Sequence, residues 1–179
     1  IEIIAVALVA VLMPVGLSVW WQLIPMAAYG LGLGFASAQL TSVVLSEVPI
    51  MQSGEGSATQ STVRQLGTAV GSAISGASLA MAVNGTLPAR LESLGLPAKF
   101  GDGLAQAVSG SAGGVIGVFR SGDGPAARFG DEAPKIADAM TSGFIEGGQW
   151  TLLVAGIMLF IGLLASVAVR RAASSHNVR

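Results

Sequence analysis

The fold is decided by the stretch QLGTAVGSAISGASLAMAVNGTLPA, residues 65–89, which carries no charged side chain. Between Gly67 and Ala80, eleven of the fourteen residues are Gly, Ala, Ser or Thr. At a helical spacing of about 100° per residue, one narrow arc collects the larger residues Val63, Leu66, Val70, Ile74 and Met81. The pattern predicts a helix with one bulky stripe and small residues over most of its remaining circumference, Leu79 being the exception.

Charge-free segments also flank this stretch, at residues 3–46 and 147–169. Only 11% of the 179 residues are charged, against about 25% in a typical soluble domain. A helix needs about 20 mostly apolar residues to cross a membrane, so residues 3–46 fit two helices, divided near Trp20, Trp21 and Pro25. We therefore expect an all-α integral membrane protein with four transmembrane helices, at about 3–19, 23–46, 63–83 and 148–169.

The composition also excludes several function classes. A net charge of −1 gives no basic surface for nucleic acid, and the absence of cysteine rules out disulfides, thiolate metal sites and a cysteine nucleophile. No Ser/His/Asp set, phosphate loop or carboxylate pair is present, and His176 stands alone in a polar tail. We expect no enzyme activity, no cofactor and no metal. A soluble helical bundle is the alternative if the chain stays in solution without detergent.

Basic residues set the expected orientation. Arg170, Arg171 and Arg179 lie in the last ten residues, and basic residues favour the cytoplasmic side. The C-terminus is then cytoplasmic, and all three tryptophans, Trp20, Trp21 and Trp150, fall at the outer ends of helices. We expect three transmembrane helices in 1–83, with a short cytoplasmic loop at 47–63. A Gly-rich extracytoplasmic loop follows at 84–146, with short helices near 88–94, 97–109 and 132–146. The chain ends with a last transmembrane helix at 147–169 and a cytoplasmic tail at 170–179.

The segment 84–146 is expected to be a passive, partly ordered loop, with a capping or gating role as the alternative. Twelve of the 19 charged residues of the chain lie between Arg90 and Glu146. This concentration of charge places the segment outside the membrane.

Small residues mark the expected contacts between helices. Lipid offers no hydrophobic drive for helices to associate, so close backbone approach at small residues must supply it. Gly30 and Gly34 form one such ridge, continued by Ala38, and Gly67 and Gly71 form another. Three glycines within residues 30–34 also weaken that helix, so a bend is an alternative use of them. The candidates for helix packing or conformational change are Gly30, Gly34, Arg64, Gln65, Gly67 and Gly71.

Few polar side chains lie inside the expected helices, and Ser37, Gln39 and Thr41 are the candidates for a substrate path. A hydrogen bond between helices is the simpler role for each of them. None of the three is ionisable, and ionisable residues are the usual marks of proton paths in membranes. A proton-coupling acid would therefore lie outside this chain.

The order of motifs resembles a known family. A glycine-ridge helix is followed by Val48-Pro49, by Gly54-Glu-Gly-Ser57, and by the block Arg64-Gln-Leu-Gly-Thr-Ala-Val-Gly-Ser-Ala-Ile74. This order resembles the C-terminal part of the fourteen-span drug:proton antiporters, the EmrB/QacA-like branch of the major facilitator superfamily. The resemblance is close over residues 23–83 and holds by layout elsewhere.

The resemblance implies a multi-pass protein of the plasma membrane that exports small amphipathic or cationic compounds in exchange for protons. Its partners would be the lipid bilayer and the remaining helices of a parent transporter. Residue 1 is Ile, and we expect the chain to be a piece of a longer one. The alternative is a self-contained four-span membrane protein with a packing or scaffold role.

Overall fold

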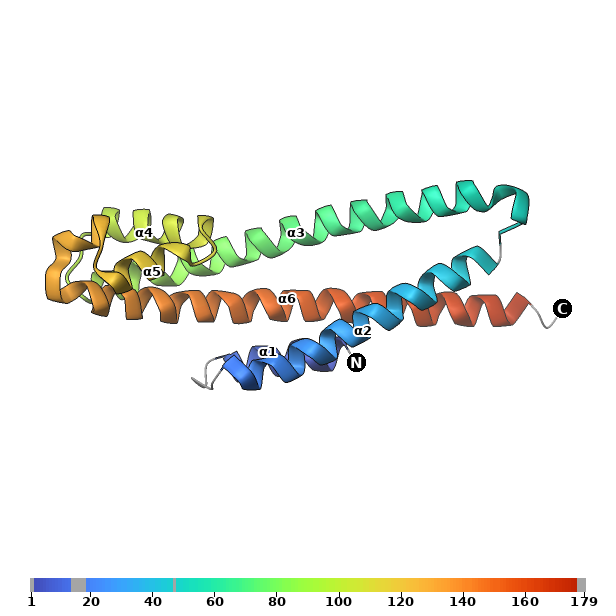
Figure 1. Ribbon diagram of the computed structural model, residues 1–179, viewed down its shortest axis with the longest axis horizontal. Helices are drawn as coiled ribbons and strands as arrows, with labels where there is room; N and C mark the ends of the chain where they lie inside the picture. The colour runs from blue at the N-terminus through green and yellow to red at the C-terminus, as the bar shows by residue number, and fades with distance from the viewer. Residues whose placement is uncertain (1, 14–18, 47, 177–179) are drawn as a thin grey trace. The chain divides into compact units, whose positions relative to one another are not determined.

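The protein is built from helices joined by short turns (Figure 1). The computed structural model describes residues 2–13, 19–46 and 48–176, and these contain no strand. The elements are α1 (Glu2–Leu12), α2 (Val19–Ser46), the 3-10 helix η2 (Ile50–Gln52), α3 (Ser53–Glu92), α4 (Ala98–Gly110), α5 (Gly114–Ser121), the 3-10 helix η3 (Gly124–Glu132) and α6 (Ala133–His176). The expectation of an all-α chain is confirmed.

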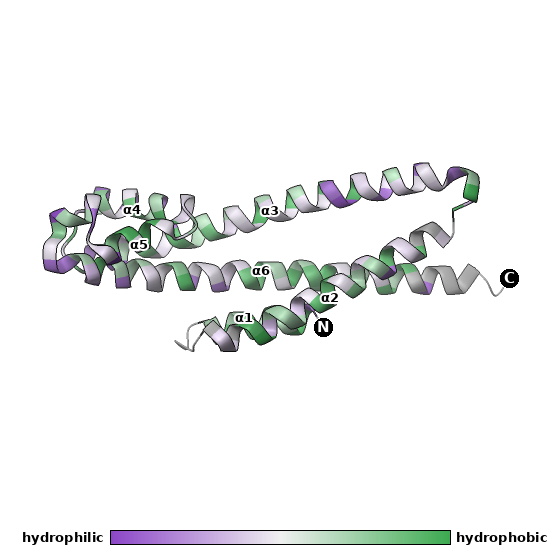
Figure 2. Cartoon of the chain, viewed as in Figure 1, coloured by the Kyte–Doolittle hydropathy of each residue, from purple (hydrophilic) through white to green (hydrophobic). Residues whose placement is uncertain are grey.

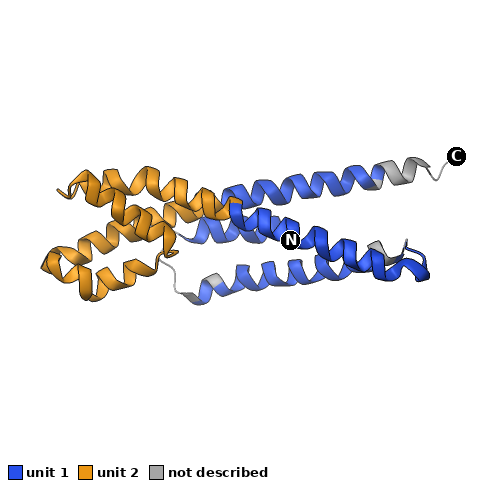
Figure 3. Ribbon diagram, turned by 90° about the horizontal axis from the view of Figure 1, so that it is seen from above, with its two compact units in different colours: residues 1–73, 152–179 blue, residues 74–151 orange. Residues whose placement is uncertain are grey.

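The chain divides into two compact units (Figure 3). Unit 1 comprises residues 1–73 and 152–179, and unit 2 comprises residues 74–151. The last residues of the expected tail, 177–179, lie outside the described part of the chain.

Three helical segments are long and apolar enough to cross a membrane: Leu23–Val43, Ile50–Glu92 and Gly124–Val169. Figure 2 shows their hydropathy along the ribbon. The shorter helix α1 has 11 residues, which span about 17 Å at 1.5 Å per residue against a hydrocarbon core of about 30 Å. The remainder of the expected first transmembrane helix falls on residues 14–18, outside the described residues.

Helix α3 is longer at both ends than expected. It begins at Ser53, so most of the expected loop 47–63 is helical and only Val48–Gln52 connects α2 to α3 among the described residues. Glu55 in the first turn of α3 faces the positive end of the helix dipole, which favours this early start. The helix also runs through Pro88 to Glu92, so the expected separate helix at 88–94 is the end of α3.

The Gly-rich segment folds as part of unit 2 and differs from the partly ordered loop that we expected. Helix α4 matches the expected helix at 97–109 to within one residue at each end, and the expected helix at 132–146 is the beginning of α6. Apolar side chains from α3, α4, α5 and α6 form one core, whose largest fully buried members are Val83, Leu87, Leu91, Val108, Phe119, Ile136 and Met140.

Two glycines bring α6 close to α3 inside unit 2. A Cβ atom placed on Gly147 would lie 2.8 Å from Cγ2 of Val83, and one placed on Gly143 would lie 3.2 Å from Cδ1 of Leu87. Neither position has room for a side chain unless its neighbour moves. The spacing Gly143-xxx-Gly147 is thus a small-residue packing motif of the kind that lets helices approach closely, and it was not among the packing residues predicted from the sequence.

Turns and polar pairs complete unit 2. Gly95, at φ +85°, donates its amide to the carbonyl of Glu92 at 2.9 Å and ends α3, since a left-handed residue is the usual helix terminator. Arg90 of α3 pairs with Glu146 of α6, which lies between the two glycines in the sequence. Both partners are more than one third exposed, so the glycine contacts and the core, and not this ion pair, dominate the stability of the unit.

The same substitution at two glycines of unit 2 is expected to have opposite effects. Gly147→Ala should lower the free energy of unfolding by about 1–3 kcal/mol, because its Cβ overlaps Val83. Gly85→Ala should raise it by about 0.5–1 kcal/mol, because Gly85 lies inside α3 with nothing within 4 Å of its Cβ position. Thermal unfolding in detergent, followed by circular dichroism, measures both. A stabilising Gly147→Ala would refute the close contact.

Candidate functional site

Four polar side chains join α2 to α3 near the turn between them. Nη2 of Arg64 donates a hydrogen bond to Oγ of Ser37 at 3.3 Å. Nε2 of Gln60 donates to Oγ1 of Thr41 at 3.2 Å. We call Ser37, Thr41, Gln60 and Arg64 the polar clasp. It connects two substrate-path candidates, Ser37 and Thr41, to the conformational candidate Arg64.

The two hydrogen bonds fix an antiparallel register. Ser37 and Thr41 lie one helical turn apart on α2, and Gln60 and Arg64 lie one turn apart on α3, so each pair shares a face of its helix. Thr41 also donates its hydroxyl to the carbonyl of Ser37 at 3.0 Å. Its oxygen is therefore both donor and acceptor, which sets the direction of the hydroxyl proton toward α2 and leaves its lone pairs for Gln60.

The short turn before α3 brings the clasp residues within reach of one another. Pro49 lies in the connection between α2 and α3. The amide of Gln52 donates a hydrogen bond to the carbonyl of Pro49 at 2.8 Å and closes a 3-10 turn there. The side chain of Val48 lies against the first turn of α3, where a Cβ on Gly56 would come within 3.2 Å of it. Glycine at position 56 thus lets the connection stay this tight.

Arg64 is the only charged member of the clasp. Among the described residues, Nη2 of Arg64 donates to the hydroxyl of Ser37, and no ion pair to this guanidinium is found there. A guanidinium carries five N–H donors, so most of the donors of Arg64 are left for water, lipid phosphate or a carboxylate beyond the described residues.

The remaining candidates lie apart from the clasp. Gln39 and Gln65 follow Ser37 and Arg64 on other faces of the two helices, and neither joins the hydrogen bonds of the clasp. The predicted packing glycines have no close neighbour: a Cβ built on any of them meets nothing within 4 Å, which applies to Gly30, Gly34, Gly67 and Gly71. Gln60 was missed by sequence reasoning, although its position one turn before Arg64 places it on the same face.

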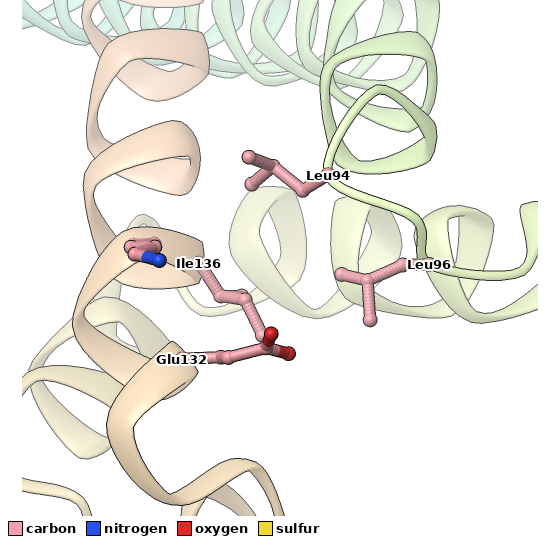
Figure 4. A pocket seen from close by; sticks show the side chains of 5 residues that line it. Leu94, Leu96, Glu132 and Ile136 are labelled. Atoms are coloured by element: carbon pink, nitrogen blue, oxygen red, sulfur yellow. The ribbon is translucent and has the colours of Figure 1, made fainter.

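A pocket lies among the described residues of unit 2 (Figure 4). It is lined by Leu94 and Leu96 from the connection between α3 and α4, and by Glu132, Lys135 and Ile136 from η3 and α6. One acid and one amine beside three apolar side chains give no nucleophile with a base and no metal ligand set. Among the described residues no group of three His, Asp or Glu side chains could hold a metal ion.

The chain matches no family model, no curated protein and no solved structure. The polar clasp joins Arg64 of the Arg-Gln-Leu-Gly block to Ser37 of the preceding apolar helix, and both helices are long and apolar enough to cross a membrane.

A double-mutant cycle is expected to detect the clasp. Arg64→Ala and Ser37→Ala should show a coupling of about 0.5–1.5 kcal/mol in the free energy of unfolding in detergent, the range of a hydrogen bond between membrane helices. The control cycle pairs Arg64→Ala with Gln39→Ala, which do not contact each other, and should give a coupling near zero. Equal coupling energies in the two cycles would contradict the contact.

Proposed function

We propose that the chain is the C-terminal part of a proton-coupled exporter of small amphipathic or cationic compounds, of the major facilitator type. The observation that supports this most directly is the hydrogen bond from Arg64 to Ser37. It links the most specific motif of the resemblance, Arg64-Gln-Leu-Gly67, to a polar residue of the preceding apolar helix.

The apolar surfaces of unit 1 fit helices that lie in a transporter bundle. The second half of α6 exposes large apolar side chains on several sides of the helix, among them Leu153, Met158 and Leu163. In water such surface costs about 25 cal/mol per Å², whereas in a bilayer it faces lipid or neighbouring helices. No ionisable residue lies between Gly147 and Val169, so proton coupling would be carried by acids on other helices of the parent transporter.

In this proposal the four transmembrane segments are α2, the first part of α3, the second part of α6, and the segment expected at about 3–19, which includes most of α1. The C-terminal arginines lie in the cytoplasm of a cell whose plasma membrane holds the protein. Unit 2 then lies on the extracytoplasmic side. The clasp lies at the cytoplasmic ends of α2 and α3, at the level where a guanidinium reaches the polar interface.

The clasp would keep α2 and α3 in register while the two bundles of the transporter move. Superfamily members alternate access by moving one bundle against the other around a site near the midplane. A pair of helices that moves as one body needs a fixed contact near its connection. Two hydrogen bonds across a short turn supply such a contact without a charged pair inside the membrane.

Export by the complete gene product tests the proposal. Arg64→Ala should lower drug efflux driven by a pH gradient by about tenfold, roughly the effect of losing 1.4 kcal/mol, while the amount of protein in the membrane stays at the wild-type level. The matched control is Arg120→Ala, which removes an exposed ion pair in unit 2 and should change efflux little. Equal efflux by the two variants would argue against a role for the clasp in transport.

The gene itself separates the two function classes. An in-frame continuation upstream of Ile1 that adds further membrane helices with intramembrane acids supports the transporter. A start codon at or just before Ile1 would overturn it in favour of a self-contained membrane protein that assembles through its small-residue faces.

A further inference from the structure

The register of the clasp extends to the glycines of α2 and α3. The clasp pairs Ser37 with Arg64 and Thr41 with Gln60, so that four residues forward on α2 correspond to four residues back on α3. Continued away from the turn, the same register places Gly34 opposite Gly67. One helical turn further, it places Gly30 opposite Gly71.

The glycines also lie on the faces that the clasp turns toward each other. The four positions on α2 are 30, 34, 37 and 41, and the four on α3 are 60, 64, 67 and 71. Both sets have spacings of four, three and four residues, and at about 100° per residue each set falls within an arc of about 60°. The glycines therefore face the partner helix of the same hairpin and not an unrelated direction.

The structure has the hairpin open at the glycine end. A Cβ on Gly30, Gly34, Gly67 or Gly71 would meet nothing within 4 Å. Figure 1 shows α2 and the first part of α3 diverging from their common turn. The clasp is formed while the glycine faces beyond it stay apart.

In unit 2 a pair of glycines with the same spacing is in contact with another helix. There Gly143 and Gly147 sit one turn apart on α6, and side chains of α3 come within 2.8–3.3 Å of their Cβ positions. In unit 1 each helix of the hairpin presents such a pair, and both pairs are vacant. Two glycine ridges in register allow a closer backbone approach than one ridge against larger side chains.

We propose that the α2–α3 hairpin has a second, closed state in which Gly34 meets Gly67 and Gly30 meets Gly71. The clasp acts as the hinge end and stays formed in both states. Closure is stabilised by dispersion contacts along the two backbones, the interaction on which helix association in lipid depends. The proposal concerns the hairpin alone and stands whether or not the protein transports drugs.

Disulfide crosslinking in membranes tests the closed state, because the chain contains no cysteine of its own. Gly34→Cys with Gly67→Cys should form a disulfide on mild oxidation, since closure brings the two Cα atoms within the roughly 7 Å that a disulfide needs. Trypsin cleaves after Arg64, so the two cysteines fall on separate peptides. Mass spectrometry of these peptides, with and without reductant, reads the yield.

The matched control is Ala28→Cys with Ala73→Cys. This pair lies at the same level of the hairpin, but each residue sits about 150° away from the facing side of its helix. Its crosslinking yield should be about tenfold lower, because its Cα atoms remain too far apart in both states. Equal yields in the two pairs would show random collision and overturn the proposal, and so would disulfides that form only between separate chains.

A blocking variant distinguishes closure from loss of folding. Gly30→Cys with Gly71→Cys is a second reporter pair, and its crosslink should disappear when Gly67→Leu is added. The open hairpin has space for this leucine, so the variant should still reach the membrane at the wild-type level. A crosslink between positions 30 and 71 that persists beside Gly67→Leu would contradict packing of the glycine ridges.

Discussion

Close approach of helix backbones at small residues is the interaction on which this protein depends. In unit 2, Gly143 and Gly147 let α6 lie against Val83 and Leu87 of α3, and the core of the unit is assembled around this contact. In unit 1 the same kind of residue appears on facing sides of the α2–α3 hairpin, without a neighbour. The glycine motif is thus in contact with a neighbouring helix in unit 2, whereas the glycines of the α2–α3 hairpin in unit 1 have no neighbour within 4 Å of their Cβ positions.

Buried hydrophobic residues are also divided unequally between the two units. Apart from Ala5 and Val6 of α1, the buried hydrophobic residues of the described chain all lie in unit 2. Unit 1 instead exposes Trp, Phe, Leu and Ile side chains along α2 and α6. Unit 2 has a buried apolar core, whereas unit 1 has the exposed apolar surface that is compatible with helices in lipid or against further helices. The charges follow this division, since they concentrate in the Arg90–Glu146 region.

The sequence allowed the helices to be predicted better than their contacts. Charge-free stretches of sufficient length marked α2, the middle of α3 and the end of α6, because hydrophobicity is read from each segment alone. The ends of α3 were missed, since Ser53 and Glu92 depend on the capping of a tight turn and on burial of Leu87 and Leu91 in unit 2. Of the polar candidates, Ser37, Thr41 and Arg64 meet, but Gln60 had no signal beyond its spacing.

The packing of residues 84–146 could not be predicted from the sequence, for a different reason. We expected this Gly-rich segment to be a partly ordered loop, but several of its glycines lie at close contacts: a Cβ placed on Gly101 would lie 3.3 Å from Cα of Pro88. A glycine that makes room for a neighbour and a glycine that loosens a loop look the same in one sequence. The two kinds of glycine differ in whether a residue of another helix lies against them, and that residue is distant along the chain.

We propose that unit 1 lies in the membrane and unit 2 on the extracytoplasmic side, and labelling of single cysteines tests this placement most directly. Gln106→Cys in α4 and Phe160→Cys in α6 replace residues that are both exposed in the structure. On intact cells, a membrane-impermeant maleimide should label the cysteine at position 106 and should reach the one at position 160 only after detergent is added. Equal labelling of both cysteines without detergent would contradict the account.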